Sequence, residues 1–429
     1  MSNTLRTLES ICRTYDDLPR EALCKTDLLR LGVAFSPEAL VITAAAKPKS
    51  YFIFSFDRTP QSELTPAERH AAPEEIAIIG GPWDFARTIV SVRMNPDSPY
   101  RVEVTRDQEL VLQCDGTPLC GVALPAMPDY YRVALPNGKP VTDIAPTLEW
   151  GYLIYLTAFR LCQYWGRDEE CQFCDINENY RQQRAEGRSY TGVKEPAEVV
   201  EALAIINALD RERVSQAYTV TGGSITTQLH GMSEAEFYAR YPAAIEEKFP
   251  GRWIGKAVVQ ALPLSEVKIL KNAGYQIYHP NYEVWDARLF EILCPGKTRY
   301  VGRNEWIKRV LDSAEIFGPA QVIPNFVAGT EMAAPHGFTS VTDAITSTAE
   351  GLDFFMSRGI CPRFTIWCVE PNTVLQQTNA EPPPLEYFAA LLRVYRATHR
   401  QYNLPIPPGY GEAGVGKAVF SVSAFMDVL

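Results

Sequence analysis

The segment EPAEVVEALAIINALDRERVSQAYTVTGGS, residues 195–224, contains one complete structural unit of this chain. Its first half carries a proline near the start and then a largely apolar run free of turn residues, which predicts a helix. After a polar turn, AYTVTGG is a short run with β-branched and aromatic residues that ends in two glycines, a pattern typical of a strand. A helix that leads into a strand is half of the alternation that builds a parallel sheet.

The same order recurs towards the C-terminus. Ser233 and Glu236 form a capping box that predicts the start of the next helix, and Gly274 predicts the end of the following one. The expected pairs of helix and strand are SEAEFYARYPAAIEEKF with KAVVQA, LSEVKILKNAG with YQIYHPNYE, RNEWIKRVLDSAEIFG with AQVIPNFVA, and residues 340–355 with RFTIWCV. The third of these helices is expected to bury one apolar face, formed by Ile307, Val310, Leu311, Ala314 and Phe317. With a first strand near Ile154, these units imply a parallel sheet that is either doubly wound or curved into a barrel.

Residues 1–146 have a different character and are expected to form a smaller, β-rich α+β region. After a helical start, the strand-like stretches are SYFIFSF, EEIAIIGG, FARTIVSVRM and RVEVTRDQELVLQC. A proline-rich connection precedes the boundary near Pro146. Residues 403–429 begin with a Pro/Gly linker, and we expect a C-terminal tail, either flexible or acting as a lid.

The composition is that of a globular protein, with 429 residues, 46% hydrophobic and 21% charged. A net charge of −10 argues against nucleic acid or an anionic membrane as a partner, because no basic excess attracts phosphates. We find no apolar run of roughly 18 residues and no apolar signal-peptide core at the N-terminus. Ten cysteines in such a chain indicate reduced thiols, so we expect a cytoplasmic protein.

Three of those cysteines fall within RLCQYWGRDEECQFCDIN, residues 160–177, with the spacing C-x8-C-x2-C: Cys162, Cys171 and Cys174. A structural zinc site usually needs four Cys or His ligands, and no histidine lies nearby. A redox CxxC pair has no need of the third thiol. A 4Fe-4S cluster with one iron left for a small molecule fits the count, whereas the bland alternative is chance proximity of three core thiols.

The neighbouring residues favour the cluster. CQFC places an aromatic, Phe173, before the last cysteine, which resembles the radical SAM (S-adenosylmethionine) superfamily, although most members space the first two cysteines by three residues and this chain by eight. TVTGGS resembles the glycine-rich segment that receives the methionine moiety of SAM, with Ser224 where the family often has an acidic residue. Glycine there would let the backbone approach a ligand.

Three later segments extend the resemblance. YHPNYEVWD resembles the strand that turns a polar residue towards SAM, here Glu283 or Asn281, and VIPNFVAGTE resembles the end of the fifth strand. IWCVEPNT resembles the sixth-strand end of biotin synthase-like members, and that branch also has the Cys-Pro-Gly-Lys turn seen at 294–297. The Tyr-Trp-Gly between the cysteines is similar to a group of radical SAM proteins encoded near nitrilases.

The resemblance implies a partial (β/α)6 parallel barrel over residues 147–402. Its cofactors would be a 4Fe-4S cluster on Cys162, Cys171 and Cys174, and S-adenosyl-L-methionine, cleaved reductively to a radical that modifies a small-molecule substrate. A one-electron donor such as flavodoxin or ferredoxin would be the partner. Whether the outcome is that of a transferase or a lyase is left open, and no catalytic side chain is assigned. The implied cofactor contacts are Phe173, Thr221, Gly222, Gly223, Ser224, Asn281, Glu283, Val327 and Gly329, and the candidate substrate contacts are His279, Glu331 and Glu370.

The competing interpretation is a non-catalytic barrel stapled by zinc or by an Fe–S cluster, with a structural or electron-transfer role. Such a site should be closed by a fourth protein ligand. The remaining cysteines are expected to be core thiols, and the acidic run at 168–170 in the cysteine loop is expected to be solvated.

Overall fold

The computed structural model describes residues 3–49, 57–60, 62–185, 192–378 and 381–429, and SYFIFSF lies outside them. The N-terminal region forms a six-stranded sheet in the order β1-β4-β5-β6-β2-β3, antiparallel except for the β1–β4 pair. Its strands are β1 (Ala34–Phe35), β2 (Glu75–Gly80), β3 (Phe85–Ser91), β4 (Tyr100–Val104), β5 (Leu110–Cys114) and β6 (Thr117–Ala123). The accompanying helices are α1 (Asn3–Thr14), α2 (Arg20–Leu31), α3 (Pro37–Thr43) and α4 (Pro66–Ala71).

The rest of the chain is built on parallel strands in chain order. β8 to β11 pair side by side, β12 pairs with β13, and the bridges Tyr278–Val322 and Glu283–Phe326 join the two sets. β7 (Thr147–Leu148) adds an antiparallel edge to β8. The parallel strands are β8 (Leu153–Phe159), β9 (Ala217–Gly222), β10 (Ile254–Val259), β11 (Ile277–Pro280), β12 (Asn325–Ala328) and β13 (Arg363–Ile366). The predicted α/β class with a parallel, partial barrel is therefore confirmed.

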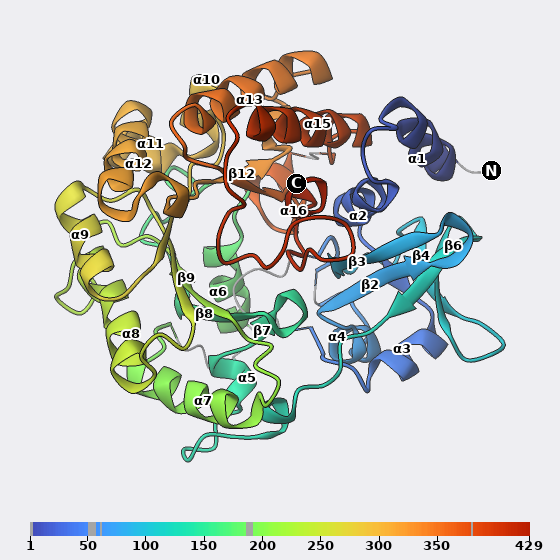
Figure 1. Ribbon diagram of the computed structural model, residues 1–429, viewed down its shortest axis with the longest axis horizontal. Helices are drawn as coiled ribbons and strands as arrows, with labels where there is room; N and C mark the ends of the chain where they lie inside the picture. The colour runs from blue at the N-terminus through green and yellow to red at the C-terminus, as the bar shows by residue number, and fades with distance from the viewer. Residues whose placement is uncertain (1–2, 50–56, 61, 186–191, 379–380) are drawn as a thin grey trace.

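Helices accompany these strands, and the long connecting ones lie on the outer side of the barrel, whereas the short last helix lies inside, in the C-terminal segment (Figure 1). They are α5 (Val141–Ile144), α6 (Ile176–Ala185), α7 (Pro196–Leu209), α8 (Glu234–Lys248), α9 (Leu264–Asn272), α10 (Ala287–Leu293), α11 (Pro295–Tyr300), α12 (Arg303–Phe317), α13 (Val341–Met356), α14 (Val374–Gln377), α15 (Leu385–Gln401) and α16 (Phe425–Val428). None of the helices in the described ranges is long and apolar enough to cross a membrane.

Local sequence signals explain several of these boundaries. The Ser233 hydroxyl accepts from the Glu236 amide at 3.3 Å while the Glu236 carboxylate accepts from the Ser233 amide at 2.8 Å, so the predicted capping box starts α8. Gly274, with φ +115°, follows the last turn of α9. The buried face of α12 differs from the expected one: it consists of Trp306, Val310, Ser313 and Phe317. Trp306, Val310 and Ser313 are fully buried, whereas Ile307, Leu311 and Ala314 are only partly buried, so the buried face is rotated towards Trp306.

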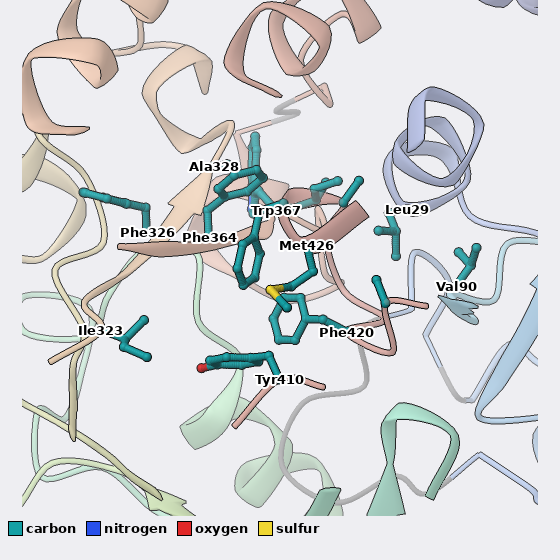
Figure 2. Packing of buried hydrophobic residues seen from close by; sticks show 14 of the residues in the cluster. Leu29, Val90, Ile323, Phe326, Ala328, Phe364, Trp367, Tyr410, Phe420 and Met426 are labelled. Carbon is teal, nitrogen blue, oxygen red and sulfur yellow. The ribbon is translucent and has the colours of Figure 1, made fainter. Parts of the chain in front are cut away.

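The C-terminal segment 403–429, expected as a tail, packs into the core (Figure 2). Its Val422 carbonyl accepts from the Ile366 amide of β13 at 3.2 Å, and its Ser421 carbonyl accepts from the Ser91 amide of β3 at 3.1 Å. Asp427 forms a fully buried ion pair with Lys25 of α2 at 2.8 Å. The segment therefore joins the N-terminal sheet to the barrel.

Candidate metal and cofactor site

A cavity of about 200 Å³ opens among the C-terminal ends of the barrel strands and the cysteine loop. Every sequence-predicted site residue lines it except Gly329, His279 and Glu331. Those on its wall are Cys162, Cys171, Phe173, Cys174, Thr221, Gly222, Gly223, Ser224, Asn281, Glu283, Val327 and Glu370. The fold thus brings segments far apart in sequence to one place.

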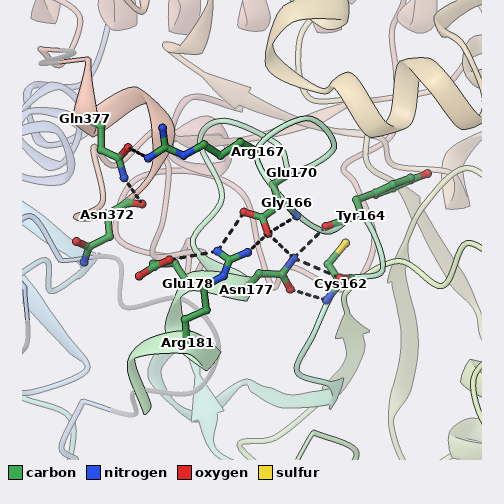
Figure 3. Close-up of polar contacts among 10 residues, drawn as sticks. All are labelled: Cys162, Tyr164, Gly166, Arg167, Glu170, Asn177, Glu178, Arg181, Asn372 and Gln377. Atoms are coloured by element: carbon green, nitrogen blue, oxygen red, sulfur yellow. Dashed lines mark hydrogen bonds and ion pairs between the residues drawn. The ribbon is translucent and has the colours of Figure 1, made fainter. Parts of the chain in front are cut away.

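The eight-residue gap between the first two cysteines is held by one buried side chain that the sequence did not single out, Asn177 (Figure 3). Its Oδ1 accepts from the Cys162 amide at 2.8 Å. Its Nδ2 donates to the carbonyls of Cys162 and Tyr164 at 3.2 and 2.9 Å, and to the Glu170 carboxylate at 3.1 Å. The side chain at the start of α6 therefore fixes both ends of the long loop.

Glu170 is the second clamp of this loop, and the expectation that it is merely solvated is wrong. Its carboxylate accepts from the Gly166 amide at 3.0 Å and pairs with Arg181 of α6 (Figure 3). Burial alone would raise the pKa of Glu170, but hydrogen bonds from Arg181, Gly166 and Asn177 lower it below its usual value. Glu169 likewise accepts from Arg299 and Tyr300, at 2.9 and 2.8 Å, so of the three acids Asp168 alone is exposed.

The three thiols differ in electrostatic environment. Burial raises the pKa of Cys162 to about 12 and that of Cys174 well above its usual value, with the neighbouring Cys171 adding to both effects. The pKa of Cys171 is lowered, first by a hydrogen bond from the Cys294 thiol and then, against its burial, by the charge of Lys297. Bound cationic metal would favour the thiolate form of all three.

The thiols are not arranged around one ion. Among the described residues, no three His, Cys, Asp or Glu side chains gather closely enough to hold a single metal ion. A polynuclear cluster requires no such gathering, because each thiolate binds a different iron. Cys294, expected as a core thiol, is buried beside Cys171 but does not line the cavity.

The structure shows a steric reason for the glycines of TVTGGS beside the expected approach of a ligand. A Cβ on Gly223 would lie 1.7 Å from the Leu161 carbonyl oxygen and 2.5 Å from Cys162 Cα, and one on Gly222 would lie 2.4 Å from the Phe159 carbonyl oxygen. The Ser224 carbonyl accepts from the Gln163 amide at 2.9 Å. Glycine is needed so that the end of β9 can lie directly against the cysteine loop.

The Cys-Pro-Gly-Lys turn packs on the other side of that loop. A Cβ on Gly296 would lie 2.5 Å from the Glu169 carbonyl oxygen, and the Gly296 amide donates to the same oxygen at 3.1 Å. Lys297 pairs with Glu283 at 2.5 Å, and both side chains are less than a tenth exposed. Glu283 has φ +77°, a strained conformation for this residue type, and is held there by β-bridging to Phe326.

The remaining predicted residues lie outside the cavity. The His279 ring bonds to the Ile323 carbonyl at 2.8 Å and to the Tyr410 hydroxyl at 3.1 Å, and burial holds its pKa well below the usual value. The Glu331 carboxylate accepts from the Gly329 amide at 2.7 Å, from the Thr348 hydroxyl at 2.8 Å and from Tyr387. Their polar atoms are thus engaged with the C-terminal segment and with α13 and α15.

Sequence reasoning also missed a polar network on the cavity rim. The Tyr164 hydroxyl donates to Gln260 Oε1 at 2.9 Å, and Gln260 Nε2 donates to the Glu234 carboxyl at 2.6 Å. Burial raises the pKa of Glu234 to about 8. Gln260 directly follows β10, and its position one residue past a strand end was the available signal.

No protein-family profile and no curated protein matches the sequence. Solved structures with a similar fold include HydG, a maturase of the FeFe-hydrogenase, at 12% identity and a TM-score of 0.42; the match covers 57% of this chain and 49% of HydG, so it spans about half of that protein. Methylornithine synthase (PylB) matches at 10% identity and a TM-score of 0.38, over 62% of this chain and 74% of its own. A radical SAM methyltransferase from Sphaerobacter thermophilus matches at 15% identity and a TM-score of 0.38, over 72% of this chain and 76% of its own. At these identities and scores the neighbours assign no activity to the chain.

Proposed function

We propose that this protein is a radical SAM enzyme acting on a small-molecule substrate. One observation carries the proposal: three cysteines of a single loop line the same cavity as the C-terminal ends of several parallel strands. Barrel enzymes place their chemistry at that end, because the loops following the strands converge there.

The donor set fits a 4Fe-4S cluster. Cys162, Cys171 and Cys174 would each bind one iron, and the cavity beside them would admit SAM to the remaining one. When bound, the cluster and SAM supply the one-electron reductive cleavage of a carbon–sulfur bond in SAM. We place this activity, with flavodoxin or ferredoxin as donor, in the cytoplasm.

The chain itself would position SAM and keep water from it. Thr221 to Ser224, Phe173, Asn281, Glu283 and Val327 line the cavity next to the cysteines and are the proposed SAM contacts. Lys297 neutralises Glu283 and places a cation near Cys171 and Cys294, which favours an ionised Cys171. Glu370, at the strand-end side of the cavity, is the proposed substrate contact. Gly329, His279 and Glu331 are proposed to act as structural residues only.

We propose a biotin synthase-like branch on two sequence features, IWCVEPNT and the Cys-Pro-Gly-Lys turn. Gly296 and Lys297 contact the cysteine loop and Glu283 respectively, so this motif supports the site directly.

The rival function is a closed structural or electron-transfer site, and the contact between Cys294 and Cys171 favours Cys294 as its fourth ligand. The two functions predict opposite results for two matched variants. In the proposed enzyme, Cys162→Ala abolishes cluster assembly and formation of 5′-deoxyadenosine from SAM and dithionite, whereas Cys294→Ala retains both. Iron and sulfide content and the electron paramagnetic resonance spectrum of the reduced, anaerobically reconstituted protein are measured beside the product.

In the closed site, Cys294→Ala loses metal as completely as Cys162→Ala, and the wild type makes no 5′-deoxyadenosine. A colourless, zinc-loaded wild type unchanged by iron reconstitution also contradicts the proposal.

A further inference from the structure

We propose that the cavity contains a substrate subsite for a small acid that also carries a hydrogen-bond donor. Arg363 at the inner end binds the anionic group, with Asn325 opposite it on β12 and Trp367 just past the end of β13 completing the subsite. This inference rests on the proposed function for the reaction, but not for the binding itself. Asn325 and Trp367 lie within VIPNFVAGTE and IWCVEPNT, two segments of the resemblance, but none of the three residues is among the implied cofactor or substrate contacts.

The cavity extends well below the cysteines. Arg363 is the first residue of β13, Asn325 is the first residue of β12, and both line the cavity. A strand rises about 3.3 Å per residue, so Arg363 lies roughly 10 Å below the end of β13 at Ile366. The cysteine loop leaves the opposite, C-terminal end of the parallel strands. The two ends of the cavity are therefore chemically separate.

Arg363 has no carboxylate partner in the described part of the chain, and its Nε has no hydrogen-bond acceptor. Its guanidinium lies against the rings of Tyr410 and Phe420, with Cζ 5.6 Å from each centroid. Aromatic packing and a hydrogen bond to the Tyr410 side chain orient the planar fork, and its buried Nε–H remains for a ligand. An arginine held in this way is suited to two parallel hydrogen bonds to a carboxylate or phosphate.

Two further polar atoms on the cavity wall lack partners, one opposite Arg363 on β12 and one just past the end of β13. Trp367 is 2% exposed and its Nε1–H has no acceptor; Asn325 is 5% exposed and its Oδ1 has no donor. Leaving such groups buried and unpaired is unfavourable, so they indicate a missing partner. The indole can donate only to an acceptor, and the amide oxygen can accept only from a donor. A ligand that satisfies both carries an anionic oxygen and an ammonium, hydroxyl or amide group.

The local charge is positive at this end. Lys256, whose ammonium donates to the Gly409 carbonyl at 2.9 Å and lies over Tyr410, adds a second cation. Burial lowers the pKa of Lys256 to about 8 and raises that of the nearby Glu149 carboxyl to about 7, so near neutral pH the carboxyl offsets only part of the positive charge of Arg363 and Lys256. The carboxylates on the cavity wall, Glu283 and Glu370, follow the ends of their strands, at the other end of the cavity. An anionic substrate group is therefore directed away from the cluster and towards Arg363.

The test is calorimetric binding to the full chain, with and without reconstituted cluster and SAM. The probes are pairs that differ in charge: L-aspartate with L-asparagine, L-glutamate with L-glutamine, and lactate with lactamide, plus inorganic phosphate. We expect at least one acid to bind and its amide not to. Arg363→Gln should weaken the acid about 10- to 100-fold, Arg363→Lys less, and Trp367→Phe severalfold. Arg358→Gln, the same change on an exposed arginine outside the barrel, should leave the affinity unchanged.

Circular dichroism and thermal melting identify variants that fail to fold. If Arg363→Gln fails to fold, Arg363→Lys and Trp367→Phe still decide the test. The proposal is overturned if no acid binds, if acids and amides bind alike, if folded Arg363 variants keep full affinity, or if they weaken SAM instead. Arg363-dependent acid binding without 5′-deoxyadenosine formation would refute the proposed reaction and leave the subsite standing. SAM cleavage without Arg363-dependent acid binding would refute the subsite and leave the proposed reaction standing.

Discussion

Replacing Asn177 by alanine should remove the clamp on the cysteine loop. The side chain makes four hydrogen bonds of 2.8–3.2 Å within the loop. Truncation leaves the Cys162 amide and two carbonyl oxygens without this partner. Allowing for water that replaces part of these bonds, the loss is about 3 kcal/mol. Because the loop must be ordered to present Cys162, iron affinity should fall by roughly 100-fold.

Asn177→Asp tests the same reasoning from another side. Aspartate keeps the acceptor for the Cys162 amide, but it loses both amide N–H donors and places a second negative charge beside Glu170. It should therefore be at least as damaging as alanine. The control is Gln182→Ala, on an exposed position of the same helix α6.

The assay is iron titration under anaerobic conditions together with urea unfolding of the metal-free protein. Asn177→Ala and Asn177→Asp should both need more iron and unfold at lower urea than Gln182→Ala. Equal iron affinity and equal unfolding free energy in all three would refute the clamp.

Three further changes have defined outcomes. Gly223→Ala should lose the cluster and several kcal/mol of stability, because its methyl group would meet the Leu161 backbone at 1.7 Å. Gly192→Ala, whose Cβ meets only the flexible Leu161 side chain at 3.6 Å, should retain iron. Equal iron content in the two variants would contradict this reasoning. Lys297→Met leaves Glu283 buried and unpaired and should lower the free energy of urea unfolding by about 3–5 kcal/mol. Recovery of this free energy in the Lys297→Met, Glu283→Leu double variant would confirm the cause. The folded state keeps a proton on Glu234 up to a pKa of about 8, whereas the unfolded state releases it near the usual pKa of 4.5. Wild-type stability should therefore fall as pH rises from about 5 to 8, and Glu234→Gln should flatten this slope. Equal stability changes between pH 5.5 and 8 in thermal melts of the two proteins would exclude Glu234 as the cause.

The parallel core was predictable because its signals are local. The Ser233 capping box, the turn at Gly274 and the apolar strands each act within a few residues, and the order of strands then follows from the alternation of helix and strand. The positions at strand ends were predictable for the same reason, since parallel strands bring their ends together. This is why Gly222, Asn281 and Val327 reach one cavity with the cysteines.

The roles of individual polar side chains were not predictable in this way. Asn177 and Glu170 appear as an ordinary helix residue and a member of an acidic run, and their burial depends on how the loop folds back on α6. His279 and Glu331 occupy strand-end positions like the cavity residues, yet each finds partners on an element that the sequence could not place beside it. Strand-end position gives the neighbourhood of a side chain, but the competing hydrogen-bond partners decide its direction.

The C-terminal segment is the clearest such case, and it bears on substrate choice. Lys25 and Asp427 are separated by 402 residues, so no local pattern indicates that the segment returns to the barrel. Once there, Tyr410 and Phe420 support Arg363, and Gly409 holds Lys256. The cysteine loop depends instead on α6, the end of β9 and the Cys-Pro-Gly-Lys turn. Truncating the Tyr410 ring to leucine should therefore alter acid binding at Arg363 while leaving iron content intact, because the two ends of the cavity are supported by different parts of the chain.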